Sequence, residues 1–127
     1  MKFFFDNCIS YKYAEMLRAL GEDVTALREK FPEDTKDIPL FEQLRGHSVV
    51  FVTTNTTQLT RKQEAKALKQ SGNTALFLGP FFERLRFWDQ AVWLLRQWPR
   101  ICGFANGVVP GTCAEIKQNG KALIYPL

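Results

Sequence analysis

Asp6 stands where the first apolar run of the chain ends, and it is the first position at which chemistry is expected. The run from Phe3 to Phe5 is apolar at consecutive positions, which is typical of a short strand buried on both faces. Ser10 then opens a segment with the apolar spacing of a helix. A strand followed by a helix indicates an α/β unit, and in such sheets ligands bind beyond the carboxyl ends of the strands. A carboxylate at that edge either binds a metal ion or caps a turn.

Two further polar residues are expected near the same edge. Asp37 precedes Pro39 and an apolar-periodic segment, so we expect it at or near the start of a helix. Asn55 follows a β-branched run, 48–53, that predicts a buried strand. Oxygen ligands gathered at one edge suit a hard divalent cation such as Mg²⁺ or Mn²⁺. Each residue also has a structural alternative, because Asp37 can cap its helix and Asn55 can serve as a turn residue.

Strands and helices are expected to alternate along the chain. We expect strands over 3–5, 23–27, 48–53 and 74–78, and helices starting at Ser10, near Asp37, at Thr60 and at Pro80. The last of these helices is expected to end at Trp98, because Pro99 follows. Two extended runs joined by Asn119-Gly120 predict a hairpin. The sequence therefore predicts one α/β domain over residues 1–127, with a mostly parallel sheet flanked by helices and a C-terminal β-hairpin.

The composition is that of a globular protein. Of 127 residues, 46% are hydrophobic and 24% are charged, which argues against a disordered chain. No apolar run is long enough to cross a membrane and no signal-peptide pattern is present, so a cytoplasmic location is expected. Cys8, Cys102 and Cys113 lack the spacing of a disulfide framework or a metal clip and are expected to be free, buried thiols. The net charge of +4 favours an anionic partner, either RNA or an acidic protein.

Several motifs together resemble those of PIN-like domains, and specifically the small VapC-type toxins. They are the apolar run ending in Asp6 with Ser10 behind it, the segment with Phe31, Pro32, Asp34, Thr35 and Asp37, the strand end Thr53-Thr54-Asn55, the helix start with Arg61, Lys62 and Glu64, and the helix with Trp88, Gln90, Ala91, Leu94, Leu95, Arg96, Trp98 and Pro99. The resemblance spans about residues 2–100. Each motif is weak alone, but their order and spacing are specific together.

The resemblance implies a metal-dependent ribonuclease that is paired with an antitoxin protein. It implies that Asp6, Asp37 and position 55 hold Mg²⁺ or Mn²⁺, which activates a water molecule against an RNA phosphodiester. Position 55 departs from the family pattern, because Asn stands where that pattern has Asp, and the site loses one negative charge. Either Asp34 or Glu64 supplies the missing charge, or the chain is a degenerate PIN-like protein that binds RNA or a protein partner without cleavage.

Two surfaces for partners are expected. Arg61 and Lys62, at a helix start, are expected to contact the RNA backbone, although a solvated helix face is the plainer alternative. On the long helix, a continuous helical wheel places Phe82, Arg86 and Trp93 together on an exposed face. That face predicts a contact with the antitoxin or with a second copy of the chain, as a homodimer. The same wheel assigns the core side to Phe81, Leu85, Trp88, Val92 and Leu95.

Overall fold

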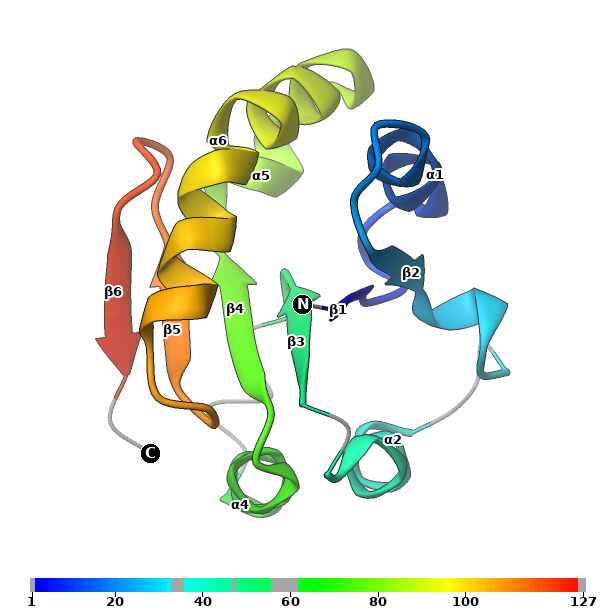
Figure 1. The fold of residues 1–127 in the computed structure, drawn as a ribbon, viewed down its shortest axis with the longest axis vertical. Helices are drawn as coiled ribbons and strands as arrows, with labels where there is room; N and C mark the ends of the chain where they lie inside the picture. Colours follow the sequence, from blue (N-terminus) through cyan, green and yellow to red (C-terminus); the bar gives the residue numbers. More distant parts are fainter. Residues whose placement is uncertain (1, 33–35, 47, 56–61, 126–127) are drawn as a thin grey trace.

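A six-stranded sheet with the order β2-β1-β3-β4-β5-β6 forms the centre of the computed structural model (Figure 1). The strands are β1 Lys2–Phe5, β2 Val24–Ala26, β3 Val49–Thr53, β4 Thr74–Leu78, β5 Cys113–Ile116 and β6 Ala122–Tyr125. Every neighbouring pair is parallel except β5 and β6, which form an antiparallel hairpin. The predicted α/β class, the mostly parallel sheet and the C-terminal hairpin are therefore confirmed.

The structure describes residues 2–32, 36–46, 48–55 and 62–125, without the side chains of residues 37–40, 62 and 64. The helices in these ranges are α1 Tyr11–Ala19, α2 Asp37–Leu44, α4 Lys62–Ser71, α5 Phe81–Arg84 and α6 Phe87–Gly107, with a 3₁₀ turn at Leu27–Glu29. One buried cluster joins α1 and α6 to one face of the sheet, and a second joins α2 and α4 to the other face. In Figure 1, α1 and α5 lie in the upper part of the view, and α2 and α4 lie at the bottom, near the lower ends of β3 and β4.

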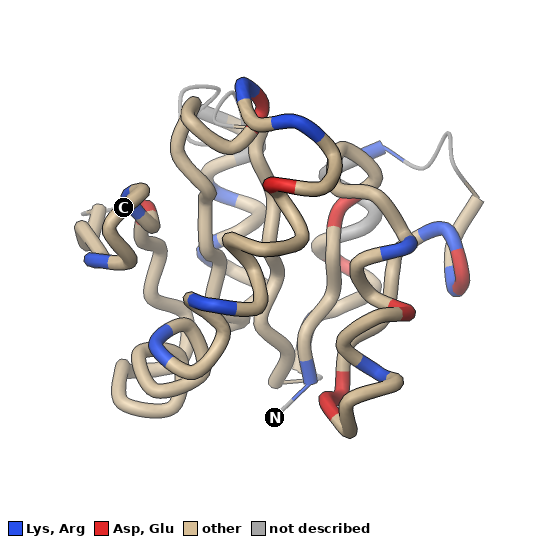
Figure 2. The backbone as a smooth tube through the Cα atoms, turned by 90° about the horizontal axis from the view of Figure 1, so that it is seen from above, with Lys and Arg blue, Asp and Glu red and all other residues tan. Residues whose placement is uncertain are grey.

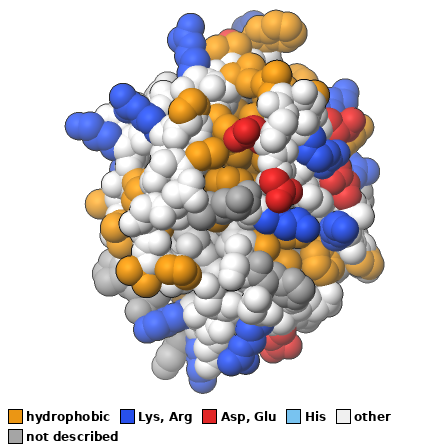
Figure 3. All heavy atoms as spheres, viewed as in Figure 1, with side chains coloured by type: hydrophobic (Ala, Val, Ile, Leu, Met, Phe, Trp, Pro, Cys, Tyr) orange, Lys and Arg blue, Asp and Glu red, His pale blue; other side chains and the backbone are white. Residues whose placement is uncertain are grey.

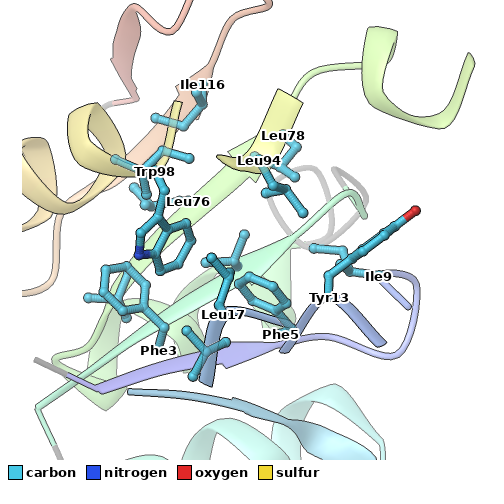
Figure 4. Packing of buried hydrophobic residues seen from close by; sticks show 14 of the residues in the cluster. Phe3, Phe5, Ile9, Tyr13, Leu17, Leu76, Leu78, Leu94, Trp98 and Ile116 are labelled. Atoms are coloured by element: carbon cyan, nitrogen blue, oxygen red, sulfur yellow. The ribbon is translucent and has the colours of Figure 1, made fainter. Parts of the chain in front are cut away.

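The side chains of β1 alternate between the two buried clusters. Phe3 and Phe5 pack on the face covered by α1 and α6, while Phe4 packs on the opposite face. The ring of Trp98, from α6, lies 4.7 Å from the ring of Phe3 and 5.9 Å from that of Phe5 (Figure 4). Burial on both faces explains why the central strands are apolar at nearly every position.

A buried asparagine ties α2 to the amino edge of the sheet. Asn73 is 3% exposed; its Oδ1 accepts a hydrogen bond from the backbone N–H of Val49 at 3.0 Å, and its Nδ2 donates to the carbonyl of Leu44 at 2.6 Å. Because Leu44 ends α2, the carboxyl end of this helix lies beside the starts of β3 and β4. The first residue of α2, at the other end of the helix, is Asp37.

The long helix predicted from Pro80 to Trp98 starts where expected, with Pro80 as its N-cap, but it is two helices and does not end at Trp98. The backbone is extended at Leu85 and Arg86, so α5 ends at Arg84 and α6 begins at Phe87. Helix α6 then continues through Pro99 to Gly107. A proline inside a helix costs about 3 kcal/mol. Burial of Ile101 and Ala105 beyond it offsets that cost.

The break before Phe87 also changes which side of the helix faces the core. Trp93 and Phe82 are 8% and 1% exposed and belong to the core, whereas Trp88 and Leu95 are 78% and 41% exposed. The predicted exposed patch of Phe82, Arg86 and Trp93 is therefore wrong, although Arg86 itself is exposed. A wheel drawn continuously from Phe81 fails because it ignores the two extended residues.

Basic residues are distributed around the molecule. In the described ranges, Lys and Arg positions occur on helices and loops on several sides of the sheet (Figure 2). No helix in those ranges combines the length and the apolar character needed to span a membrane. The net charge of +4 thus does not by itself locate a binding face.

Candidate functional site at the carboxyl edge

The strand order reverses between β1 and β3. From β1 the chain crosses to β2 on one side, and from β3 it crosses to β4 on the other side. In parallel sheets the crevice at such a switch point is where ligands bind. The register pairs Phe5 with Val52, and the backbone N–H of Asp6 donates to the carbonyl of Val52 at 2.9 Å. This pairing brings Asp6 next to Thr53 at the carboxyl edge.

Three donors from the described part of the chain contact the carboxylate of Asp6. The hydroxyl of Thr53, which is fully buried, donates to Oδ2 at 2.6 Å, and the thiol of Cys8 lies 3.7 Å from the same oxygen. The backbone N–H of Asn7 donates to Oδ1 at 2.8 Å. Asp6 does not cap α1, because the Oγ of Ser10 accepts from Lys12 N–H there. Asp6 thus fixes its own turn and also reaches across to β3.

The thiol of Cys8 is part of this network. Its Sγ lies 3.4 Å from Thr53 Oγ1 and accepts from the backbone N–H of Thr54 at 3.3 Å. Burial of the thiol group, and then the neighbouring Asp6 carboxylate, raise the pKa of Cys8, so the thiol is neutral at physiological pH and acts as a hydrogen-bond donor. The residue as a whole is exposed, so its predicted burial is wrong. It lies in the turn beyond β1 instead of inside a strand or helix.

The other two cysteines lie away from the carboxyl edge. Cys113 is buried and Cys102 is half-buried. All three cysteines are free thiols, as predicted.

The Thr53 hydroxyl that donates to Asp6 also contacts Asn55. The backbone N–H of Asn55 donates to Thr53 Oγ1 at 3.0 Å, and the residue is half-buried. The hydroxyl of Thr54, the residue before Asn55, is buried and has no hydrogen-bond partner in the described part of the chain. A buried polar atom left unpaired is typical of a place that a water molecule or ligand completes. The structure therefore places Asp6 and Asn55 at one edge, beside an unsatisfied hydroxyl.

The remaining predicted site residues are only partly described. Asp37 is the first residue of α2, but its side chain is not described. Asp34 and Arg61 lie outside the described residues, and the side chains of Lys62 and Glu64 in α4 are not described. The described side chains contain no group of three or more His, Cys, Asp or Glu that could hold a metal ion. A metal ion bound by Asp6 would need carboxylates from these other positions.

Two members of the network, Thr53 and Cys8, were not predicted as site residues. The only signal for Thr53 in the sequence is that a hydroxyl residue ends a β-branched strand. Its contact with Asp6 depends on β1 and β3 being neighbours in register, which strand patterns alone do not give.

A cavity of about 420 Å³ adjoins the network. It lies between the start of α1 and the end of β2 and is lined by Asn7, Ile9, Ser10, Tyr11, Ala26 and Arg28. The guanidinium carbon of Arg28 lies 4.5 Å from the centre of the Tyr11 ring. A cation beside an aromatic ring is a combination that proteins use to hold single-stranded nucleic acid.

A family model described as a PIN like domain matches residues 1–80. The matched span runs from β1 to the end of β4 and contains Asp6, Asp37 and Asn55, while α5, α6, β5 and β6 lie beyond it. No curated protein and no solved structure matches the chain.

Proposed function

Because the chain belongs to the PIN-like domain family, we propose that it is a metal-dependent endoribonuclease, the toxin of a toxin-antitoxin pair in the cytoplasm. The observation that carries this proposal is the position of Asp6 at the β1/β3 switch point, oriented by the Thr53 hydroxyl. A carboxylate fixed at the ligand-binding edge of such a sheet is suited to hold a cation.

The proposed metal ligands are Asp6 and Asp37, with the amide oxygen of Asn55 and with Asp34 or Glu64 as the source of further charge. Oxygen donors of this kind fit Mg²⁺ or Mn²⁺. When bound, such an ion lowers the pKa of a water molecule and neutralises charge on a phosphodiester. In this arrangement Thr53 positions the Asp6 carboxylate, and the neutral Cys8 thiol adds a weak donor to the same oxygen.

The proposed substrate is RNA. The cavity with Tyr11 and Arg28 opens beside the Asp6 turn, where it can take a nucleotide next to the cleaved bond. Arg61 and Lys62 are proposed to contact backbone phosphates, which supply affinity without sequence information. The net charge of +4 agrees with an anionic substrate.

The test is cleavage of a mixed single-stranded RNA pool in Mn²⁺ by the wild type and by Asp6→Asn. This change keeps the size of the side chain but removes its charge, and we expect a loss of about 100-fold or more, the scale seen when one charge-stabilising group leaves an active site. Asp23→Asn is the matched control, because Asp23 is exposed and lies before β2 at the opposite edge. Equal cleavage by the wild type and Asp6→Asn would refute the nuclease proposal.

A second candidate function is RNA or protein binding without cleavage. It is favoured by Asn55, which lacks the charge of the family's aspartate, and by the three donors that already satisfy Asp6. Asn55→Asp separates the two candidates. If the chain is an impaired nuclease, the change should raise both Mn²⁺ affinity, measured by calorimetry, and RNA cleavage. No cleavage by either form, with RNA binding retained, would favour the binding protein.

A further inference from the structure

The outer face of α6 carries apolar side chains that are largely exposed. Trp88 and Leu95 are 78% and 41% exposed, and half-buried Val92 lies between them at the spacing of one helix face. Phe87, next to Trp88, is 53% exposed; one side of its ring contacts Tyr13 and Lys12. We call these four residues the α6 patch. In Figure 3 hydrophobic side chains gather at the top of the molecule, where Figure 1 shows the start of α6.

Helix α6 has a buried face as well as the exposed α6 patch. The opposite side of α6 buries Trp93, Leu94 and Trp98. The start of the helix is also anchored, because the Tyr13 hydroxyl is bonded to the Phe87 carbonyl at 2.8 Å and to Gln90 Oε1 at 2.6 Å. The patch is therefore presented on a fixed helix, and little ordering is needed when a partner binds.

Arginines flank the α6 patch. Arg84 and Arg86 precede the helix and Arg96 lies beside Leu95; all three are exposed. The described structure contains no ion pair and no side-chain hydrogen bond for any of these three. Between residues 81 and 107 four arginines stand against two acids, Glu83 and Asp89. Exposed tryptophan with arginine is the composition enriched in protein interfaces and their energetic centres.

We propose that the α6 patch docks an acidic, amphipathic helical segment of a protein partner. The apolar side chains of such a segment would pack on Trp88, Val92 and Leu95, as helices pack through residues three and four apart. Its acidic side chains would meet the unpaired arginines, which gives the contact its specificity. The patch lies beyond residues 1–80, the span matched by the PIN-like family, and the proposal does not depend on nuclease activity.

Repulsion between like charges argues against a second copy of the chain as the partner that binds the α6 patch. A symmetric dimer would bring two patches of net positive charge together, because on each copy Arg84, Arg86, Arg96 and Arg100 outnumber Glu83 and Asp89. Like charges brought together in this way are unfavourable. RNA would pair with the arginines and stack on Trp88, but the aliphatic Val92 and Leu95 offer no stacking surface.

The experiment uses the full chain and its own tryptophan fluorescence. Trp93 and Trp98 are buried, and their indole N–H groups donate to Gln118 and Glu22 respectively, so Trp88 is the exposed reporter. The probe is a synthetic helical peptide with leucines on one face and glutamates on the other. A second peptide has lysine in place of every glutamate.

We expect the acidic peptide to shift the emission to shorter wavelength in a saturable way, and the lysine peptide to bind at least about tenfold more weakly. Trp88→Ala should abolish the shift. By calorimetry, Leu95→Ala and Arg96→Glu should each weaken the Kd of the acidic peptide about tenfold. Leu20→Ala and Lys66→Glu are matched controls elsewhere on the surface, and both should leave the Kd unchanged.

Several results would overturn the proposal. These are no shift with the acidic peptide, equal affinity for the two peptides, or an unchanged Kd in Arg96→Glu. A concentration-dependent dimer that Trp88→Ala abolishes in sedimentation experiments would assign the patch to a second copy. A shift produced by single-stranded RNA but not by the acidic peptide would assign it to nucleic acid. All the substituted residues are exposed, so unchanged thermal unfolding is expected and would show that each variant is folded.

Discussion

The carboxyl edge between β1 and β3 and the helix α6 are held by different kinds of interaction. At the edge, short polar side chains bond to one another, and the Thr53 hydroxyl alone contacts Asp6, Cys8 and the Asn55 backbone. Along α6, tryptophans on one side are packed into the core while Trp88 on the other is open to solvent. Stability at the edge should therefore depend on single polar atoms. Along α6, stability should depend on side-chain volume, and only on the buried side of the helix.

The largest effect is expected for Trp98→Ala. Trp98 is 5% exposed, packs on Phe3 and Phe5, and donates its indole N–H to Glu22 Oε1 at 2.7 Å. Truncation of a buried tryptophan costs about 3–5 kcal/mol in the free energy of unfolding, which denaturant titration measures. The paired variant Trp88→Ala should cost about 0.5 kcal/mol or less. Equal losses would contradict the assignment of inner and outer faces to α6.

A smaller loss is expected for Thr53→Val at the carboxyl edge. Valine keeps the shape of the side chain but leaves Asp6 Oδ2 and the Asn55 N–H without their shared partner. The lost hydrogen bond to the charged carboxylate should cost about 1.5–3 kcal/mol in the free energy of unfolding. Thr53→Ser keeps the hydroxyl and should recover most of the loss. If serine and valine destabilise equally in denaturant titration, packing matters at this edge more than the hydrogen bonds do.

In the β5–β6 hairpin, the contribution of one carboxylate to stability is expected to depend on pH. The Glu115 carboxylate accepts from the Tyr125 hydroxyl and pairs with Lys117 at 2.9 Å, and these contacts hold the pKa of Glu115 below its usual value. Because the pKa of Glu115 is lowered in the folded protein, its contacts stabilise the fold above the pKa of an unfolded glutamate, about 4.3. This stabilisation is lost as the pH falls through the pKa of Glu115 in the folded protein.

Tyr125→Phe removes the first of these contacts. The variant should be less stable than the wild type by about 1.5 kcal/mol at pH 7, the scale of a hydrogen bond to a charged group. Urea titrations across the acid range should show this difference shrinking as pH falls below about 4. A difference that stays constant with pH would assign the effect to the lost hydroxyl's packing and not to the charged carboxylate.

The smallest effect is expected in the reactivity of Cys8. Because the Asp6 carboxylate is one cause of the raised pKa of Cys8, Asp6→Asn should lower that pKa. The thiolate fraction, and with it the rate of alkylation by iodoacetamide at mildly alkaline pH, should rise a few-fold. Burial raises the pKa of Cys113 to about 11, and its rate should not change. Peptide mass spectrometry follows both sites, and an unchanged rate at Cys8 would show that burial alone controls its pKa.

Local patterns predicted the sheet better than the long helix. The strand over 74–78 and the hairpin at Asn119-Gly120 appear where expected, because a buried apolar run and a turn dipeptide act through near neighbours. Pro99 was expected to end a helix and does not, because the residues beyond it gain burial from distant parts of the chain. Propensity was overridden there by tertiary packing.

The carboxyl edge shows the same limit on prediction from sequence. Strand ends place Asp6 and Asn55 at that edge without knowledge of the sheet order. The role of Thr53 requires that β1 and β3 be neighbours with Phe5 opposite Val52, and no local pattern encodes that pairing. Cys8 was expected to be buried from its residue type alone, whereas its place in a turn exposes it.

The distance along the chain between Thr53 and Asp6 has a consequence for when the protein can become active. Their hydrogen bond joins residues 47 positions apart, and β1 meets β3 only after the whole intervening segment has been synthesised. Closing so long a loop is entropically costly, and nonlocal parallel pairing is slow. On a ribosome, the Asp6 carboxylate would at first lack Thr53 and keep local contacts such as those with Asn7 and Cys8. We therefore expect nascent chains and fragments that end before β3 to be inert, so that any activity appears only once the sheet is assembled.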